Sequence, residues 1–156
     1  MFDVANVDEG KMLDMGALGE QLVAKVLTEK FNAKVVLSGN PWDSVKDMTV
    51  NGVNCEVKTQ IPWCTQNAFA VKKNQQKKCN DAEVLIFVEP PYNNPYGKND
   101  AINIWLSKKE ERKFFHKRSN DGRIMIGYPL RNMEIIHTID DSYLCEKIVK
   151  LSNSQV

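Results

Sequence analysis

The stretch DMTVNGVNCEVK, residues 47–58, holds the strongest structural signal in this sequence. Its central Asn51-Gly52 pair favours a two-residue β-hairpin turn, because a type I′ turn needs a positive φ at both central positions. With that turn, the register of the hairpin follows by counting outward along both strands. The predicted pairs, in order from the turn, are Val50 with Val53, Thr49 with Asn54, Met48 with Cys55, and Asp47 with Glu56.

This register gives the hairpin one apolar and one polar face, because successive side chains of a strand point to opposite sides. The apolar face holds Met48, Val50, Val53, Cys55 and Val57. The polar face holds Asp47, Thr49, Asn54, Glu56 and Lys58. We therefore expect the apolar face to pack on the core and the polar face to carry any chemistry.

Two carboxylates, on Asp47 and Glu56, are expected directly opposite each other, with Cβ atoms about 4.5–5.5 Å apart. Like charges in that arrangement destabilise a strand pair unless something neutralises them. Lys58 would neutralise part of the repulsion, and a divalent cation bridging both carboxylates would neutralise more. Mg²⁺ suits such a site because it takes oxygen ligands and binds through one or two carboxylates together with substrate phosphates. The alternative is a solvated hairpin face whose carboxylates pair with Lys46 and Lys58.

The composition is that of a globular protein: 156 residues with 42% hydrophobic and 26% charged residues, which we interpret as a single domain, 1–156. The net charge of +1 gives no overall attraction to nucleic acid or membranes, so any basic surface must be local. Four dispersed cysteines without a histidine cluster argue against zinc. Residues 1–11 do not have the pattern of a signal peptide, and no apolar run is long enough to span a membrane. These features predict a cytoplasmic protein with free thiols.

Hydrophobic periodicity predicts helices and strands in alternation. Helices are expected at residues 14–31 with Asp14 as the cap, at 107–117 after a capping-box pattern, and from Asp140 or Asp141 onward. Gly16 and Gly19 in the first helix permit close approach of another backbone. Besides the hairpin, strands are expected at 34–37, 68–71, 82–89, 102–106, 123–128 and 134–138, with a surface loop at 92–100. This order indicates an α/β (α+β) fold with a mixed central sheet flanked by helices.

The acidic hairpin and the helix before it together resemble the PD-(D/E)XK nuclease superfamily, whose fold is restriction-endonuclease-like. The matching residues are Gly19, Glu20, Val23 and Ala24 in the first helix, Asp47 on one strand, and Glu56-Val57-Lys58 on the next. The order of elements from about residue 14 to residue 106 also fits. Lys46 stands where the family name implies proline, so Asp43, which follows Pro41 by two residues, is an alternative metal ligand. We prefer Asp47 because the register sets it opposite Glu56.

The resemblance implies a role for each matching residue. Asp47 and Glu56 would bind Mg²⁺, which Mn²⁺ can replace, together with the carbonyl of Val57. Lys58 would orient the attacking water or help to deprotonate it, and Glu20 would supply a further carboxylate. Gln60, on the same face as Glu56 and Lys58, would touch the phosphate or the water, or would simply be an edge-strand glutamine.

The implied activity is that of a Mg²⁺-dependent DNA endonuclease, acting as a homodimer if it cuts both strands. Holliday-junction-resolvase-like, restriction-like and homing-type enzymes share these motifs. The compact size, without an added recognition domain, favours a resolvase-like or a phage- or mobile-element-type nuclease, which implies a bacterial, archaeal or phage-infected cell. The alternatives are an RNase or single-strand nuclease on the same scaffold, and a nucleic-acid-binding module without catalysis.

Two basic clusters are candidate nucleic-acid contacts, because lysine and arginine neutralise phosphates. The first cluster comprises Lys72, Lys73, Lys77 and Lys78. The second runs from Lys108 to Arg123 and includes Lys108, Lys109, Arg112, Lys113, Lys117 and Arg118. Each cluster could instead be an ordinary solvated face. Trp42 and Trp63 flank the motif strands, where a tryptophan either stacks on a base or packs in the core.

Overall fold

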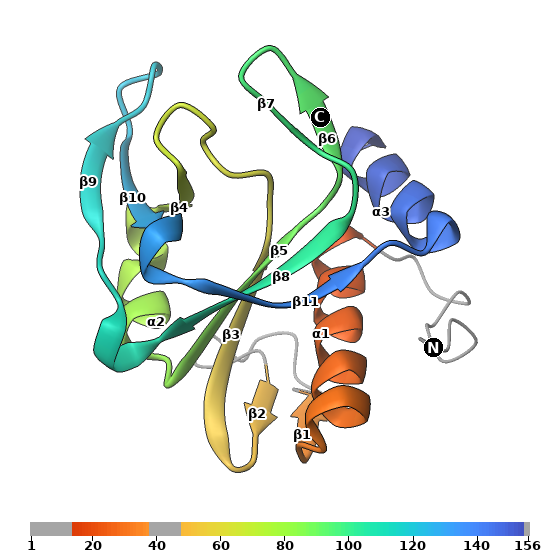
Figure 1. The fold of residues 1–156 in the computed structure, drawn as a ribbon. Helices are drawn as coiled ribbons and strands as arrows, with labels where there is room; N and C mark the ends of the chain where they lie inside the picture. The colour runs from red at the N-terminus through yellow and green to blue at the C-terminus, as the bar shows by residue number, and fades with distance from the viewer. Residues whose placement is uncertain (1–13, 38–47, 155–156) are drawn as a thin grey trace.

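The computed structural model describes residues 14–37 and 48–154, with the side chains of residues 153 and 154 excluded, and has a mixed α/β fold (Figure 1). Its centre is a six-stranded sheet in the order β1-β2-β3-β5-β8-β11, in which only the β3–β5 pair is parallel among the described strands. These strands are β1 (Val35–Leu37), β2 (Met48–Val50), β3 (Val53–Thr59), β5 (Val84–Glu89), β8 (Ile102–Lys108) and β11 (Glu134–Ile139). The predicted mixed sheet flanked by helices is therefore confirmed.

The remaining elements cover the two faces and the upper end of this sheet (Figure 1). The helices α1 (Met15–Phe31) and α3 (Ser142–Ser154) lie on one face. On the other lie α2 (Gln76–Asp81) and a second sheet of β4 (Ala68–Lys72), β10 (Ile124–Pro129) and β9 (Phe115–Arg118). Short pieces complete the described chain: the hairpin β6 (Tyr92–Asn94) and β7 (Gly97–Asn99), and the 3₁₀ turns η2 (Lys73–Gln75), η3 (Lys109–Glu111) and η4 (Leu130–Asn132).

The β2–β3 hairpin has the predicted register. Val50 pairs with Val53, Thr49 with Asn54, and Met48 with Cys55. Asn51 and Gly52 have φ values of 51° and 84°, as the turn requires. The next predicted pair, Asp47 with Glu56, cannot be compared because Asp47 lies outside the described residues, as do Asp43, Lys46 and Trp42.

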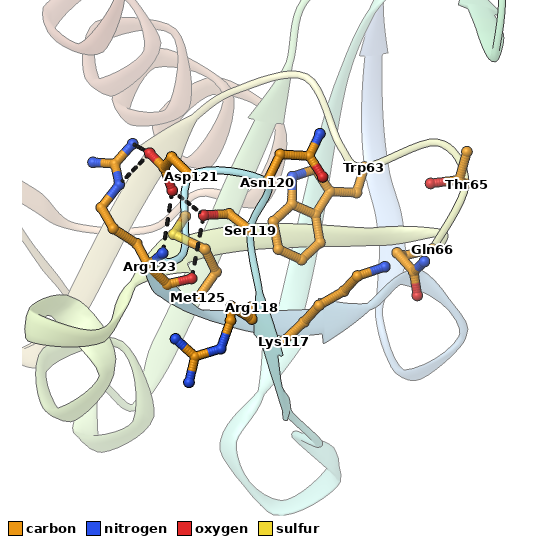
Figure 2. Close-up of a pocket in the computed structure, with 10 residues that line it drawn as sticks. All are labelled: Trp63, Thr65, Gln66, Lys117, Arg118, Ser119, Asn120, Asp121, Arg123 and Met125. Carbon is orange, nitrogen blue, oxygen red and sulfur yellow. Dashed lines mark hydrogen bonds and ion pairs between the residues drawn. The ribbon is translucent and has the colours of Figure 1, made fainter.

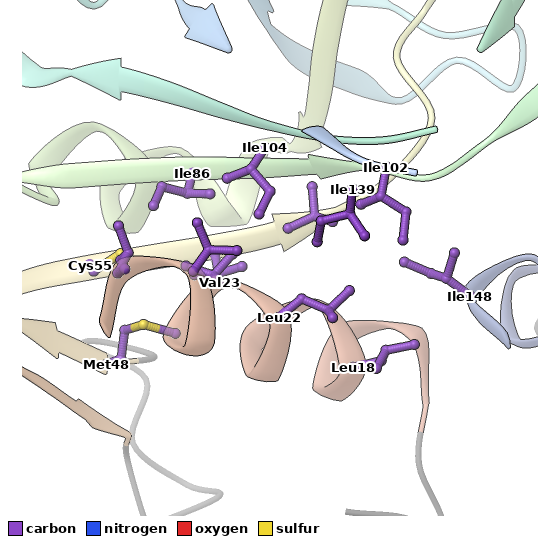
Figure 3. Packing of buried hydrophobic residues seen from close by; sticks show 14 of the residues in the cluster. Leu18, Leu22, Val23, Met48, Cys55, Ile86, Ile102, Ile104, Ile139 and Ile148 are labelled. Carbon is purple, nitrogen blue, oxygen red and sulfur yellow. The ribbon is translucent and has the colours of Figure 1, made fainter. Parts of the chain in front are cut away.

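Two hydrophobic cores lie on either side of the central sheet. The first packs α1 and α3 on the sheet and contains the predicted apolar face of the hairpin, with Met48 and Cys55 fully buried (Figure 3). Val53, beside the turn, is the exception and is 41% exposed. The second core lies between the two sheets, where the rings of Phe69 and Phe87 stack with centroids 4.5 Å apart. Because side chains alternate along β3, its polar residues point toward this second layer.

α1 approaches β3 closely because of one glycine. Asp14 caps the helix as predicted, its Oδ1 accepting from the Ala17 amide at 2.7 Å. At Gly19, an added Cβ would overlap Thr59 Oγ1 at the end of β3. At Gly16, an added Cβ would meet only the Asp14 side chain, at 3.5 Å. Of the two glycines predicted to permit close approach, Gly19 alone is required for it.

Two sequence predictions of local structure were wrong. The basic helix expected at 107–117 is instead the end of β8, the 3₁₀ turn η3 and the strand β9, because pairing of β8 with β5 continues to Lys108 and overrides the local capping pattern. The loop expected at 92–100 contains the β6–β7 hairpin. The sequence reading also missed α2, a six-residue helix with Cys79 as its one buried residue.

None of the described helices is both long and apolar enough to cross a membrane.

Candidate active site

Glu56 is a carboxylate buried between the layers, with 1% of its surface exposed. It lies on β3 beside Leu85 of β5, and therefore points toward α2 rather than toward α1. Two ammonium groups approach the same oxygen: Lys58 Nζ lies 3.2 Å and Lys78 Nζ 3.4 Å from Glu56 Oε1. Burying a carboxylate is costly unless it is paired, and these two lysines provide the compensating charge.

Besides its ion pair with Glu56, Lys58 has a second contact that holds it in place. Its Nζ donates to Gln75 Oε1 at 2.8 Å, and Gln75 belongs to the η2 turn that leads into α2. The side chains of Lys58 and Lys78 are 24% and 20% exposed, so both amines stay within reach of solvent. The predicted neighbours Glu56 and Lys58 are thus brought together, while Lys78 joins them from α2.

A hollow of about 460 Å³ lies beside this cluster. The hollow is lined by residues of β3, η2 and α2 and by the residue after α2: Asn54, Asn74, Gln75, Lys77, Lys78, Asp81 and Ala82. Lys78 and Gln75 therefore each contact both the hollow and the buried ion pair. A phosphate placed here would meet ammonium and amide donors.

The described residues do not by themselves form a metal site. They contain no group of three or more histidine, cysteine, aspartate or glutamate side chains placed to hold a metal ion. Glu20 is half-buried on α1, next to the glycine that touches Thr59. The second carboxylate expected at this site is that of Asp47, which is outside the described residues.

Gln60 has a clear structural role. Its Nε2 donates to the carbonyl of Ala70, and its Oε1 accepts from the amide of the same residue, both at 2.7 Å. The side chain thus replaces a missing backbone rung between the end of β3 and β4. Of the two roles predicted for Gln60, these contacts favour the edge-strand glutamine.

The predicted nucleic-acid residues differ in how far they are engaged by the protein. Lys72 and Lys73 are exposed. Ion pairs hold Lys77 to Asp81 at 2.7 Å, Lys108 to Glu134 at 3.4 Å and Lys109 to Glu83 at 3.3 Å. Arg112 directs its guanidinium inward, to Ser107 and to the carbonyls of Cys79, Asn80 and Ala82, at 2.8–2.9 Å. Its contacts favour a structural role.

Cys79 is the buried residue of α2, near the charged cluster, but it is not suited to act as a nucleophile. Burial raises the pKa of its thiol to about 12, although the charge of Lys58 opposes the shift. The group therefore remains a neutral thiol at physiological pH, and nucleophilic catalysis requires the thiolate. Cys79 is therefore not a candidate nucleophile for hydrolysis at this site.

Comparison of the sequence with protein-family models and with curated proteins gave no match. The function therefore has to be argued from the residues themselves.

Proposed function

We propose that the protein is a Mg²⁺-dependent endonuclease that hydrolyses phosphodiester bonds of DNA. The observation that carries the proposal is the fully buried Glu56 with Lys58 at 3.2 Å, two positions along the same strand. A buried carboxylate paired with lysines beside a polar hollow is an arrangement found at functional sites. The resemblance of Glu56-Val57-Lys58 and of the Gly19-Glu20 segment to PD-(D/E)XK nucleases supports the same conclusion.

The residues present fit a magnesium ion in part. Glu56 offers a carboxylate and Val57 a backbone carbonyl, both oxygen donors of the kind Mg²⁺ prefers. Asp47 would complete the set from the neighbouring strand. When bound, the ion supplies charge stabilisation at the phosphate oxygens and lowers the pKa of a coordinated water.

The chain's own residues would position the substrate and stabilise charge. Gln75 fixes one hydrogen of the Lys58 ammonium, which leaves its other two donors for Glu56 and for a water or phosphate oxygen. Lys58 would then orient the attacking water and stabilise the negative charge that develops on the phosphate. Lys78, from α2, would hold the phosphate beside the same carboxylate.

Lys58 and Lys78 provide a matched pair of variants, because their amines contact the same oxygen at similar distances. We expect wild-type protein to nick supercoiled plasmid with Mg²⁺ and not with EDTA. Lys58→Ala should lower the cleavage rate at least 100-fold, as is usual when one group that stabilises the transition state is removed. Lys78→Ala should mainly weaken DNA binding.

Both variants should first be shown to fold by circular dichroism. Equal cleavage rates for the two variants would assign Lys58 a purely electrostatic role. Absence of metal-dependent cutting by the wild type on duplex, branched and single-stranded DNA and on RNA would remove the nuclease proposal. A preference for a four-way junction over linear duplex would favour a resolvase-like enzyme, and a preference for RNA would favour the RNase.

A binding module without catalysis is the second candidate. It is favoured by the contact of two lysines with Glu56, an arrangement that also occurs in structural ion-pair networks. In that case, Lys58→Ala would lower stability and leave no activity to lose. We further propose that the protein is cytoplasmic and, as an endonuclease that cuts both strands, a homodimer.

A further inference from the structure

A second groove, of about 520 Å³, lies between the β9–β10 hairpin and the turn of residues 63–66 (Figure 2). Trp63 forms one wall, and Lys117 of β9 places its Nζ 5.9 Å from the centre of a Trp63 ring. The amides of Gln66 and Asn120 also line the groove. An aromatic ring with amide and ammonium donors around it can bind a planar ring together with an anionic group.

Backbone hydrogen bonds of Trp63 fix the position from which its side chain enters the groove. Its amide donates to the Ala68 carbonyl at 2.7 Å, and its own carbonyl accepts from Gln66 N at 3.1 Å. The turn is completed by Asn67 with a φ of 49°, whose carbonyl accepts from the amide of Leu130 at 2.9 Å. The side chain itself is half-buried, which leaves part of its surface to a ligand.

The charge around this groove is mainly positive. Lys117 and Arg118 are exposed, and Arg118 uses one nitrogen on the carbonyl of Gly122 at 2.8 Å. Asp121 is the acidic residue in the groove lining. Its carboxylate forms an ion pair with the Arg123 guanidinium at 2.7 Å and accepts a hydrogen bond from the hydroxyl of Ser119. Those contacts hold the pKa of Asp121 far below its usual value, so it stays ionised and neutralises Arg123. The free positive charge therefore comes from Lys117 and Arg118.

The groove continues toward the proposed active site. A neighbouring hollow of about 430 Å³ shares Arg118, Arg123 and Met125 with it and adds Lys72, Lys73 and Asn74. Asn74 in turn lines the hollow beside Lys78. Three hollows that share lining residues thus lie between Trp63 and the Glu56–Lys58–Lys78 cluster, and each has lysine or arginine side chains in its lining.

We propose that this path binds a single-stranded nucleic-acid segment, with one unpaired base stacked on Trp63 and the phosphates on Lys117, Arg118, Lys72 and Lys73. That the strand then reaches a cleavage site rests on the function proposed above. Base stacking on an aromatic ring is stronger than a cation–π contact at an exposed site, so a base can displace the Lys117 ammonium toward a phosphate. A duplex keeps its bases stacked inside and cannot offer one to the indole.

The test uses a labelled oligothymidylate of about 12 nucleotides, a duplex of the same length, and fluorescence anisotropy in EDTA at about 50 mM salt. We expect Trp63→Leu to weaken binding of the single strand about tenfold and to leave duplex binding nearly unchanged. Trp63→Tyr, which keeps an aromatic face, should restore most of the affinity. Lys117→Gln should weaken binding of the single strand and reduce its salt dependence.

Tyr143→Leu on α3 is the matched control, since this tyrosine is 49% exposed and carries Lys147 Nζ 5.8 Å from its ring centre. It should bind both probes as the wild type does. Unchanged binding of the single strand by Trp63→Leu, or equal weakening of both probes, would overturn the proposal.

Because binding is measured in EDTA, its outcome is independent of cleavage. If the protein binds the single strand through Trp63 but cuts no substrate, the groove proposal is supported and the nuclease proposal is wrong. If the protein cleaves normally but its binding does not depend on Trp63, the nuclease proposal is supported and the groove proposal is wrong.

Discussion

At Gly19, a single hydrogen atom in place of a side chain decides how closely α1 can approach β3. Alanine would gain about 1 kcal/mol of helix propensity. Its Cβ would, however, overlap Thr59 Oγ1. We therefore expect Gly19→Ala to lower the free energy of unfolding by about 1–3 kcal/mol, the usual cost of overpacking, as measured by urea denaturation.

Gly16→Ala is the control for this substitution. Its Cβ would meet only Asp14, at 3.5 Å, so we expect a gain of about 0.5–1 kcal/mol from helix propensity. The double variant Gly19→Ala/Thr59→Ala should recover part of the stability lost in Gly19→Ala. A loss of similar size at both glycines would show that tight packing against Thr59 is not the cause.

The residues of the candidate site were only partly predictable. Glu56 and Lys58 follow from the hairpin, because a period of two places them on one face. Lys78 was predicted as a nucleic-acid contact. Its ion pair with Glu56 could not be predicted from the sequence, because α2 is short and lacks an apolar stripe that would reveal a helix. The contact of Gln60 with Ala70, ten residues further along the chain, depends on how the end of β3 docks on β4, which no periodic pattern specifies.

At the scale of elements, the contact between α1 and β11 should make the stability of the fold depend on pH. Lys30 Nζ lies 3.0 Å from His137 Nδ1, and burial together with the charge of Lys30 lowers the pKa of His137 below its usual 6.5. The unfolded chain therefore takes up a proton first as the pH falls. The stability that comes from neutral His137 is complete above about pH 6.5 and is lost as the pH falls toward the lower pKa of the folded state.

We expect the wild-type melting temperature to fall between pH 7.5 and pH 5 more steeply than that of His137→Gln, measured by differential scanning fluorimetry. His116→Gln is the control, because that histidine is exposed on β9. The melting temperature of His116→Gln should fall with pH as steeply as that of the wild type. Identical slopes for His137→Gln and the wild type would show that the Lys30–His137 contact does not control stability.

Most strands could be predicted because their apolar residues recur with the right period, and the hairpin register because its turn allows only one pairing. The failure at 107–117 has a physical cause. The pattern Ser107 to Glu110 suits a helix start locally, but Ser107 is buried in β8 and accepts a hydrogen bond from Arg112. The division of the strands into two sheets depends on long-range pairing, which periodicity does not report.

At the scale of the molecule, Arg112 ties the α2 layer to the central sheet. Its guanidinium donates to three carbonyls at the end of α2 and to both oxygens of Ser107 on β8. We expect Arg112→Met to lower the free energy of unfolding by on the order of 3 kcal/mol, because hydrogen bonds from a charged donor are lost and buried carbonyls are left unpaired. Urea denaturation measures this.

Arg112→Lys should not restore the loss, since an ammonium cannot reproduce the guanidinium fork. Arg131→Met, an exposed site, should change stability by no more than about 0.5 kcal/mol. Full stability in Arg112→Lys would show that the charge alone is sufficient.

The Gln60 side chain bonded to Ala70 fastens the end of β3 to β4, and these segments bracket Trp63. The two sheets cannot slide past one another there without breaking both bonds. A nucleotide whose base stacks on the Trp63 indole would then be separated from Lys58 by a constant number of phosphates, so the indole would set the distance to the cleavage site. Each cut in a free strand would then fall a fixed number of nucleotides from the base stacked on Trp63, whatever the sequence.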